Sequence, residues 1–148
     1  MSDVTQYCTF RVERLMLGID VHVVQEVMRP LEGTRVPLAP SAVVGLINLR
    51  GQIVTAVDLR RRLNLPDRAA HEPSMNIVMR TNEEAISLVV DEIGDVIEVS
   101  RDTFERVPDS LQGEARHLIK GVHKLNDHLL LVLDGALVAA SSPALSAA

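Results

Sequence analysis

Two parts of this 148-residue chain resemble each other, and this internal repeat constrains the fold more than any other feature. The matching segments keep both their order and their spacing. At a spacing of 71 residues they are Leu17-Gly18-Ile19-Asp20 with Leu88-Val89-Val90-Asp91 and Arg35-Val36-Pro37 with Arg106-Val107-Pro108; at 76 residues they are Gly45 with Gly121, Leu49 with Leu125, Ile53 with Leu129, Val57 with Leu133 and Asp58 with Asp134. The repeat predicts two similar lobes.

Short β-strands are indicated throughout, because apolar and polar residues alternate over short runs that end at turn residues. The predicted strands are residues 7–12, 15–21, 46–49, 53–57, 77–79, 85–90 and 96–99, with a second hairpin over 122–133. The turns of the two hairpins fall at Arg50-Gly51 and at Asn126-Asp127. We therefore expect a mainly β protein of two five-stranded lobes, each curled into a small barrel that hides its sheet edges.

The polar stretch 67–74 is the expected break between the lobes, since it carries Pro73 and few residues that could be buried. This places lobe 1 at about 14–72 and lobe 2 at about 76–134, with the terminal segments completing the lobes, within one domain spanning 5–140. Lobes of this size are marginal alone, so they should bury apolar surface against each other. The Ala- and Ser-rich tail, 141–148, is expected to be loose.

Short helices are predicted after two aspartates. Asp20 stands at an N-cap position before apolar residues at helical spacing, which are Val23, Val24, Val27 and Met28, and Pro30 ends that segment. Asp58 stands in the same way before Leu59 and Leu63. The repeat supplies matching aspartates at 91 and 134, and we interpret all four as caps of exposed backbone N–H groups.

Composition argues against several classes of partner. The net charge is −5 and the chain has one Tyr, two Phe and no Trp, so nucleic acid is an unexpected partner. The N-terminus has no secretory signal pattern, and the longest apolar run is far shorter than a membrane helix, so we expect a cytoplasmic protein without direct membrane insertion. The single cysteine, Cys8, lies in an alternating strand and is expected to be buried.

The sequence contains no pattern that predicts catalysis. Neither a phosphate-binding glycine loop nor a Gly-x-Ser-x-Gly elbow occurs. His123 and His128 flank a predicted turn, but neither a cysteine nor a third histidine completes a metal site, so we interpret them as surface histidines. We expect no enzyme activity, cofactor or metal; a small metal-dependent hydrolase using these histidines and nearby carboxylates is the alternative.

Glu26 and Arg50 stand out because the fold does not require either of them. Glu26 lies on the polar side of the first predicted helix, and Arg50 precedes Gly51 at a turn. In the second half the same turn positions hold Asn126-Asp127, so the repeat does not demand an arginine. These two charges are either ordinary solvated residues or part of a binding surface.

The run from Gly45 to Arg60, which contains Asn48-Leu49-Arg50-Gly51 and Val57-Asp58-Leu59-Arg60, closely resembles the signature of the CheW family of chemotaxis coupling proteins. Its flanks are also similar to that family, namely Tyr7 to Val12, Val24-Gln25-Glu26-Val27 and the segment from Val89 to Val96. The resemblance covers about residues 7–138. It implies two SH3-like five-stranded barrels and a non-enzymatic adaptor that couples the cytoplasmic tips of chemoreceptors to a CheA-type histidine kinase.

Carried over residue by residue, the resemblance implies two binding surfaces. The receptor-binding candidates are Val24, Glu26, Arg50, Gly51, Ile93 and Val96, and the kinase-binding candidates are Val27, Arg29 and Val36. The implied partners are the regulatory domain of the kinase and a methyl-accepting receptor tip, which would recruit the adaptor to membrane-associated arrays. The same coupling fold could instead serve surface motility or another chemosensory output.

Overall fold

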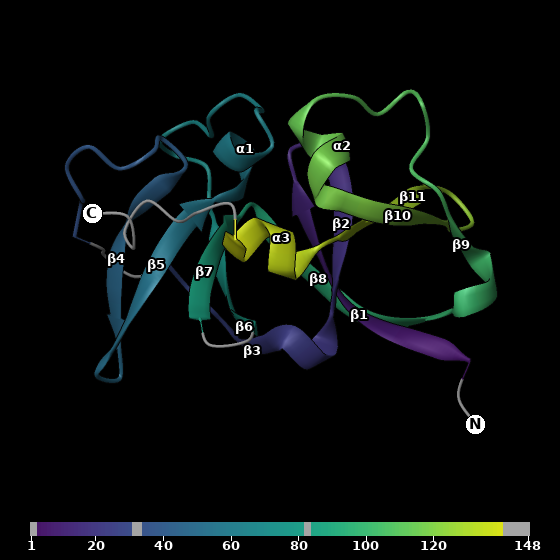
Figure 1. The fold of residues 1–148 in the computed structure, drawn as a ribbon, viewed down its shortest axis with the longest axis horizontal. Helices are drawn as coiled ribbons and strands as arrows, with labels where there is room; N and C mark the ends of the chain where they lie inside the picture. Colours follow the sequence, from purple (N-terminus) through teal and green to yellow (C-terminus); the bar gives the residue numbers. More distant parts are fainter. Residues whose placement is uncertain (1–2, 31–33, 82–83, 141–148) are drawn as a thin grey trace.

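The computed structural model describes residues 3–30, 34–81 and 84–140, which form two β lobes side by side with short helices around them (Figure 1). The strands in the described residues are β1 Val4–Val12, β2 Leu15–Asp20, β3 Val24–Met28, β4 Val43–Leu49, β5 Gln52–Asp58, β6 Met75–Thr81, β7 Glu84–Val90, β8 Glu92–Ser100, β9 Phe104–Glu105, β10 Ile119–Lys124 and β11 Leu129–Leu133. The helices are α1 Leu59–Arg62, α2 Glu114–Leu118 and α3 Gly135–Ala140, with 3-10 turns η1 Val21–Val23 and η2 Arg101–Thr103.

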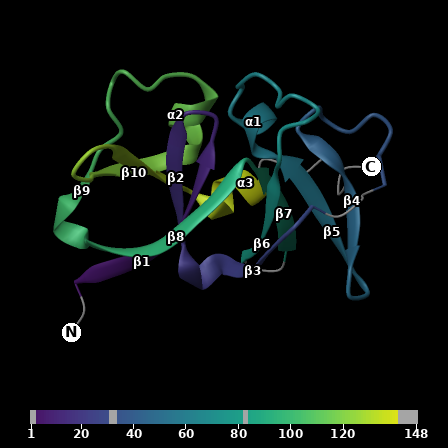
Figure 2. The ribbon, with the colours of Figure 1, turned by 180° about the vertical axis from the view of Figure 1, so that it is seen from behind.

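Each lobe is built on one sheet. One sheet, here called the terminal sheet, has the strand order β8-β1-β2-β11-β10-β9 and takes its strands from both ends of the sequence. The other, the mid-chain sheet, has the order β3-β6-β7-β5-β4 and lies between residues 24 and 90. Figure 2 shows the same two lobes from behind, with β8 running across the terminal sheet.

The two sheets have the same strand order once each strand is matched to its partner in the repeat. β8, β1, β2, β11 and β10 occupy the places that β3, β6, β7, β5 and β4 occupy in the mid-chain sheet. In both sheets one neighbouring pair in the middle is parallel, β2 with β11 and β7 with β5. The predicted repeat is therefore present in the structure as a repeated topology.

The two halves of the chain exchange strands. The first half gives β1 and β2 to the terminal sheet and β3, β4 and β5 to the mid-chain sheet, whereas the second half gives β6 and β7 to the mid-chain sheet and β8 to β11 to the terminal sheet. The predicted lobe boundaries, 14–72 and 76–134, therefore do not match sheet membership. The mid-chain sheet is instead one continuous stretch from β3 to β7, and the terminal sheet combines β1 and β2 with β8 to β11, so each half of the chain gives two strands to the sheet that the other half dominates.

The hairpins of the two halves pair at the predicted offset of 76 residues. In the first hairpin Val43 pairs with Val57, and in the second Ile119 pairs with Leu133. Both ladders then shift register, directly before Gly45 and Gly121. A side chain at either glycine would collide with the segment that crosses it: an ideal Cβ lies 2.6 Å from the Thr34 carbonyl oxygen at Gly45, and 2.1 Å from the Phe104 ring at Gly121. Glycine at both positions is explained by this close approach.

A shared hydrophobic core holds the lobes together. Phe10 and Leu17 from the terminal sheet belong to the same buried cluster as Ile77 and Leu88 from the mid-chain sheet, and Val138 of α3 joins them. Two smaller clusters serve one lobe each: Tyr7, Leu130 and Val132 in the terminal sheet, and Leu49, Val54 and Val78 in the mid-chain sheet. The expected burial of apolar surface between the lobes is confirmed.

Most predicted strands are confirmed, and three predictions need correction. The expected barrels are not closed; each lobe is a sheet with two edge strands. The predicted helix after Asp20 is only the 3-10 turn η1, and Val24–Met28 is a strand that pairs with β6. A helix, α3, forms after Asp134 where none was predicted. The tail, 141–148, lies outside the described residues.

Candidate functional site

The turn of the first hairpin has an unusual backbone for an arginine. Arg50 and Gly51 form a two-residue connection between β4 and β5, and both have positive φ, 53° and 86°. Two positive φ values are typical of the type I′ turn, which favours Asn-Gly because most side chains are strained there. The Asn48 side chain supports the turn, since its Oδ1 accepts the Gly51 N–H at 3.0 Å. The backbone of the turn therefore does not explain why this residue is an arginine.

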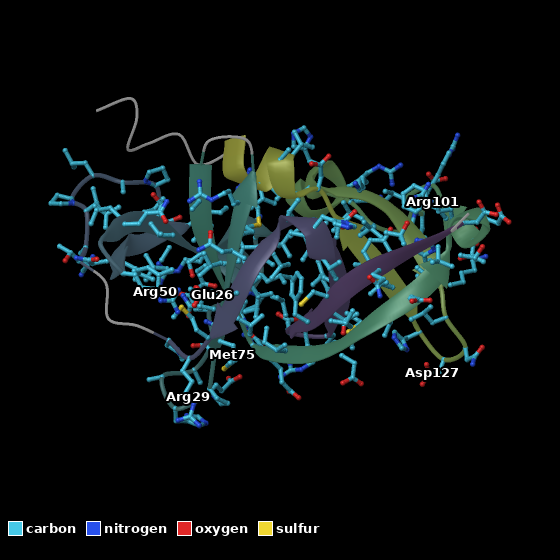
Figure 3. All side chains as sticks on the ribbon, turned by 90° about the horizontal axis from the view of Figure 1, so that it is seen from below. Glu26, Arg29, Arg50, Met75, Arg101 and Asp127 are labelled. Atoms are coloured by element: carbon cyan, nitrogen blue, oxygen red, sulfur yellow. The ribbon has the colours of Figure 1, made fainter. Side chains whose placement is uncertain are left out.

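Glu26 holds the guanidinium of Arg50. The ion pair is bidentate: Arg50 Nη2 donates to Glu26 Oε1 at 3.0 Å, and Nη1 donates to Oε2. Figure 3 shows the two side chains next to each other, Glu26 from β3 and Arg50 from the turn. The hydrogen bond from Arg50 lowers the pKa of Glu26, so this carboxylate stays ionised at neutral pH.

The ion pair also shows that the mid-chain sheet is strongly curved. β3 and β4 are its two edge strands, yet Glu26 on β3 meets the turn that follows β4. The sheet must therefore curl until its edges come together at this end. The Glu26 side chain is 22% exposed and that of Arg50 is 71% exposed, so the arginine presents its surface to solvent while the glutamate anchors it.

Exposed aliphatic side chains lie on the same elements. Ile53, two residues after Gly51, is 60% exposed, and Val27, next to Glu26, is 38% exposed. Val24 is half-buried and packs against the shared core. Val27 points to the opposite face of β3 from Glu26, because successive side chains of a strand alternate.

The other two receptor-side candidates lie on the terminal sheet. Ile93 and Val96 are on β8, an edge strand, and pair with Phe10 and Cys8 of β1. Ile93 is half-buried against the shared core, and Val96 is 58% exposed. The structure thus brings Glu26, Arg50 and Gly51 together, while Ile93 and Val96 belong to the other lobe.

The kinase-side candidates occupy β3 and the segment that follows it. Val27 lies on β3 and Arg29 directly after it, exposed and away from Arg50 in Figure 3. Val36 is half-buried and lines a cavity of about 890 Å³ on the mid-chain lobe, whose other walls include Pro30 and Ile47. Val36 therefore faces a different part of the surface from the Arg50 turn.

One charged cluster was not recognised in the sequence. Asp91 lies where the chain crosses from β7 to β8, and it is 4% exposed. Arg60 of α1 donates to it at 3.0 and 2.5 Å, Arg68 donates at 2.6 Å, and the Glu13 N–H donates at 2.8 Å. Burial alone would raise the pKa of Asp91, but these hydrogen bonds outweigh it and lower the pKa to about 2.

The four aspartates of the repeat therefore have different roles. Asp20, Asp58 and Asp134 accept backbone N–H groups of His22, Arg60 and Leu137, as caps do. Asp91 also accepts a backbone N–H, but its main partners are two guanidinium groups, so its interpretation as a simple cap is wrong. No signal in the sequence marks this cluster: Arg60 is followed directly by Arg61 and Arg62, and only the structure shows that Arg60 is buried.

The histidines are separated rather than gathered. His123 is 1% exposed, with Nε2 3.3 Å from the Tyr7 hydroxyl and Nδ1 2.9 Å from Thr103 Oγ1. The interpretation of His123 as a surface histidine is wrong, because it points inward from β10, whereas His128 is exposed beside Asp127. In the described ranges no three His, Cys, Asp or Glu side chains form a group that could hold a metal ion.

Cys8 is buried, as predicted, and burial raises the pKa of its thiol. Across residues 3–30, 34–81 and 84–140, none of the helices has the length and apolar character needed to span a membrane.

Comparison with known proteins adds an independent line of information. The model of the CheW-like domain family matches residues 6–142. The chain is similar to chemotaxis protein CheW of Bacillus subtilis, with 31% identity over 84% of this chain and 80% of that protein. It is also similar to chemotaxis protein CheW of Helicobacter pylori, with 27% identity over 89% of this chain and 79% of that protein.

A solved structure has the same fold. The scaffolding protein TtCheW from Thermoanaerobacter tengcongensis superimposes with a TM-score of 0.80 and 25% sequence identity, covering 88% of each chain. The exchanged two-sheet arrangement is therefore shared with a protein described as a scaffold.

Proposed function

The chain belongs to the family of CheW-like domains, and from that premise we propose that it is a non-enzymatic adaptor that couples chemoreceptor cytoplasmic tips to a CheA-type histidine kinase. The observation that carries the proposal is the match to the family over residues 6–142, together with the Arg50–Glu26 pair at an exposed turn. The relatives are named chemotaxis proteins, and the structural neighbour is described as a scaffolding protein.

The proposed receptor contact is the solvent-facing guanidinium of Arg50 and the aliphatic groups around it. Receptor tips are expected to present an amphipathic helix, whose apolar side can cover exposed valines and whose polar side can meet Arg50. The residues proposed for this contact are Val24, Glu26, Arg50, Gly51, Ile93 and Val96. Those proposed for the kinase contact are Val27, Arg29 and Val36.

Coupling by such a protein depends on geometry. An adaptor without catalytic groups changes the activity of a kinase only by binding one arrangement of its partners better than another. The shared core and the buried Asp91 cluster hold the lobes as one unit, so contacts on one lobe fix the orientation of the other. Recruitment to membrane-associated arrays follows from binding the receptors, and many modest contacts in an array add up to firm assembly.

The test measures binding of the full chain to a receptor-tip fragment and, separately, to the regulatory domain of the kinase. Arg50→Glu and Glu26→Lys each place like charges side by side and should weaken the receptor contact. The charge-swapped double variant, Glu26→Arg with Arg50→Glu, restores the ion pair with reversed polarity. If the receptor recognises Arg50 itself, the affinity of the double variant for the receptor fragment stays low. Its thermal unfolding midpoint nevertheless returns to that of the parent.

Asn126→Glu is the matched control, because it puts a glutamate at the equivalent turn of the other lobe. It should bind the receptor fragment like the parent. Unchanged binding of both partners by both single variants would show that the site is wrongly assigned. A stoichiometric transition metal in the purified protein would contradict the adaptor proposal and favour a metal-dependent hydrolase.

A further inference from the structure

Two of the three Tyr and Phe side chains in the chain gather at one pocket of the terminal sheet. This pocket, here called the aromatic pocket, has a volume of about 390 Å³ and is lined by Thr5, Tyr7, Asp20, Arg101, Phe104, Lys120 and His123. Its size falls in the range of roughly 300–1,000 Å³ that small-molecule sites occupy. None of the residues proposed above for receptor or kinase binding lines it.

Three rings pack together in the lining of the pocket, and of these Phe104 is the exposed one. The Tyr7 and His123 rings are 5.5 Å apart, and the Phe104 and His123 rings are 5.3 Å apart. His123 is 1% exposed and its ring nitrogens already face Tyr7 and Thr103, so it supports Phe104 from behind and offers a ligand neither ring surface nor a hydrogen bond. Phe104 lies over Gly121 and is 42% exposed, which leaves ring surface open to a ligand.

The rim of the pocket is cationic. Arg101 and Lys120 are both exposed, and within the part of the chain that the structure describes neither belongs to a salt bridge. Asp20 is the one carboxylate in the lining, and it is occupied by the His22 backbone N–H at 2.9 Å and by the His22 ring nitrogen at 2.8 Å. Two cations against one carboxylate leave a net positive charge.

The fold does not require this chemistry, because the other lobe fills the equivalent positions differently. By the repeat offsets, Arg101, Lys120 and His123 correspond to Pro30, Val44 and Ile47. Those three residues line the 890 Å³ cavity of the mid-chain lobe. The two pockets therefore occupy matching places in matching lobes; both linings contain arginine, but aromatic rings line only the pocket of the terminal lobe.

From this contrast we propose that the aromatic pocket binds a small planar aromatic anion, such as an aromatic carboxylate. The planar ring stacks on the exposed surface of Phe104, and the carboxylate accepts hydrogen bonds from Arg101 and Lys120. A single negative charge on the ligand balances the net charge of the lining. The inference is independent of the adaptor function and of the Arg50 turn.

The test uses 2-naphthoate as the probe, with the isotope-labelled full chain and two-dimensional amide NMR. Saturable shifts are expected for the amides around Phe104 and from Lys120 to His123. The cationic probe 2-naphthylmethylammonium should bind at least roughly tenfold more weakly, and inorganic phosphate should produce no saturable shift, since it has charge but no ring.

Lys120→Gln should weaken binding of 2-naphthoate roughly fivefold, because a charge-assisted hydrogen bond is lost from an exposed position that the fold does not need. Arg35→Gln is the matched control: it removes the same charge from the cavity lining of the other lobe and should leave the affinity unchanged. Three results would overturn the proposal: no saturable shift in the pocket, equal binding of the cationic probe, or equal effects of the two variants.

Discussion

At the scale of single residues, the backbone at Arg50 suits asparagine better than arginine, so the requirements of folding and of the proposed binding can be tested separately. Its φ of 53° is one that asparagine adopts more easily, and Asn-Gly is the preferred pair for this kind of turn. The arginine is therefore a poor choice for the fold and a useful one for a contact. A substitution can remove the second property without harming the first.

Arg50→Asn should leave the thermal unfolding midpoint equal to that of the parent or slightly higher, because the turn gains a better residue while an exposed ion pair is lost. Binding of the receptor-tip fragment should fall. Calorimetric titration and a thermal melt on the same sample measure both effects. A variant that is clearly less stable than the parent would show that Arg50 is retained for folding.

Asp91 makes the folding stability of the protein depend on pH in the acidic range. Its folded-state pKa of about 2 is lower than the ordinary value of 3.8, so the unfolded chain takes up its proton first as the pH falls. The stabilisation is fully present above about pH 4 and is lost as the pH drops toward 2. The shift corresponds to a contribution on the order of 2 kcal/mol.

Urea unfolding of the parent at pH values between 5 and 2 should therefore show a decline that Asp91→Asn does not share. The variant should already be less stable at neutral pH, by about 3 kcal/mol, because Arg60 and Arg68 keep their buried charges without a carboxylate. Parallel curves for parent and variant would show that other carboxylates, and not Asp91, carry the acid sensitivity.

At the scale of elements, the two equivalent glycines are expected to respond differently to the same change. A Cβ at Gly45 meets a backbone carbonyl, that of Thr34, which cannot turn aside. A Cβ at Gly121 meets only the ring of Phe104, which is partly exposed and can rotate away. The two glycines occupy equivalent places in the strand pairing, but different groups lie against them: a backbone carbonyl at Gly45 and an aromatic ring at Gly121.

Gly45→Ala should destabilise the protein by about 1–3 kcal/mol, the usual cost of overpacking, and Gly121→Ala by less. Denaturant unfolding of both variants measures the difference. Combining Gly121→Ala with Phe104→Ala should remove the remaining cost specific to the collision. Equal losses in the two single variants would contradict the idea that the atoms crossing each glycine set the cost, since alanine at either position otherwise lowers the entropy of the unfolded chain by the same amount.

The sequence predicted elements well where their signals are local. Strand alternation and the turns at Arg50-Gly51 and Asn126-Asp127 are set by neighbouring residues, and the structure confirms both hairpins. The stretch from Val24 to Met28 failed because its apolar spacing fits a helix, while pairing with β6, some 50 residues away, makes it a strand. That competition is decided by tertiary contacts, which a local pattern does not contain.

The candidate site was predictable in part for the same reason. Arg50 and Glu26 were identified as residues that the fold does not need, but their contact depends on how the sheet curls. Asp91 and His123 were misjudged because their burial is set by α1 and by η2, segments distant in sequence. Charge and polarity in a sequence do not reveal which few polar residues a fold encloses.

At the scale of the whole molecule, strand exchange makes the two halves of the chain interdependent. A cut in the exposed loop before β6, between Ala70 and His71, yields fragments 1–70 and 71–148. Each fragment holds strands of both sheets and completes neither. The cut also divides the shared core, with Phe10 and Leu17 in one piece and Ile77 and Leu88 in the other.

Neither fragment alone should give the far-ultraviolet circular dichroism or the dispersed amide spectrum of a β protein. Mixed in equal amounts, they should assemble into a folded complex, because every strand pairing between the halves remains available. A fragment that folds alone would contradict the interdependence of the halves. Fragments cut at a hairpin turn, such as Arg50-Gly51, provide a comparison in which a local pairing is also interrupted.

The strand exchange also affects how such a gene can change. Recombination between two related genes at the loop before β6 replaces strands in both lobes at once, and it separates Glu26 and Arg50 of the proposed receptor contact from Ile93 and Val96. A crossover cannot transfer one intact lobe as a module. Altered partner preference in this protein is therefore expected to arise by substitutions at exposed positions such as Arg50, and not by the shuffling of halves.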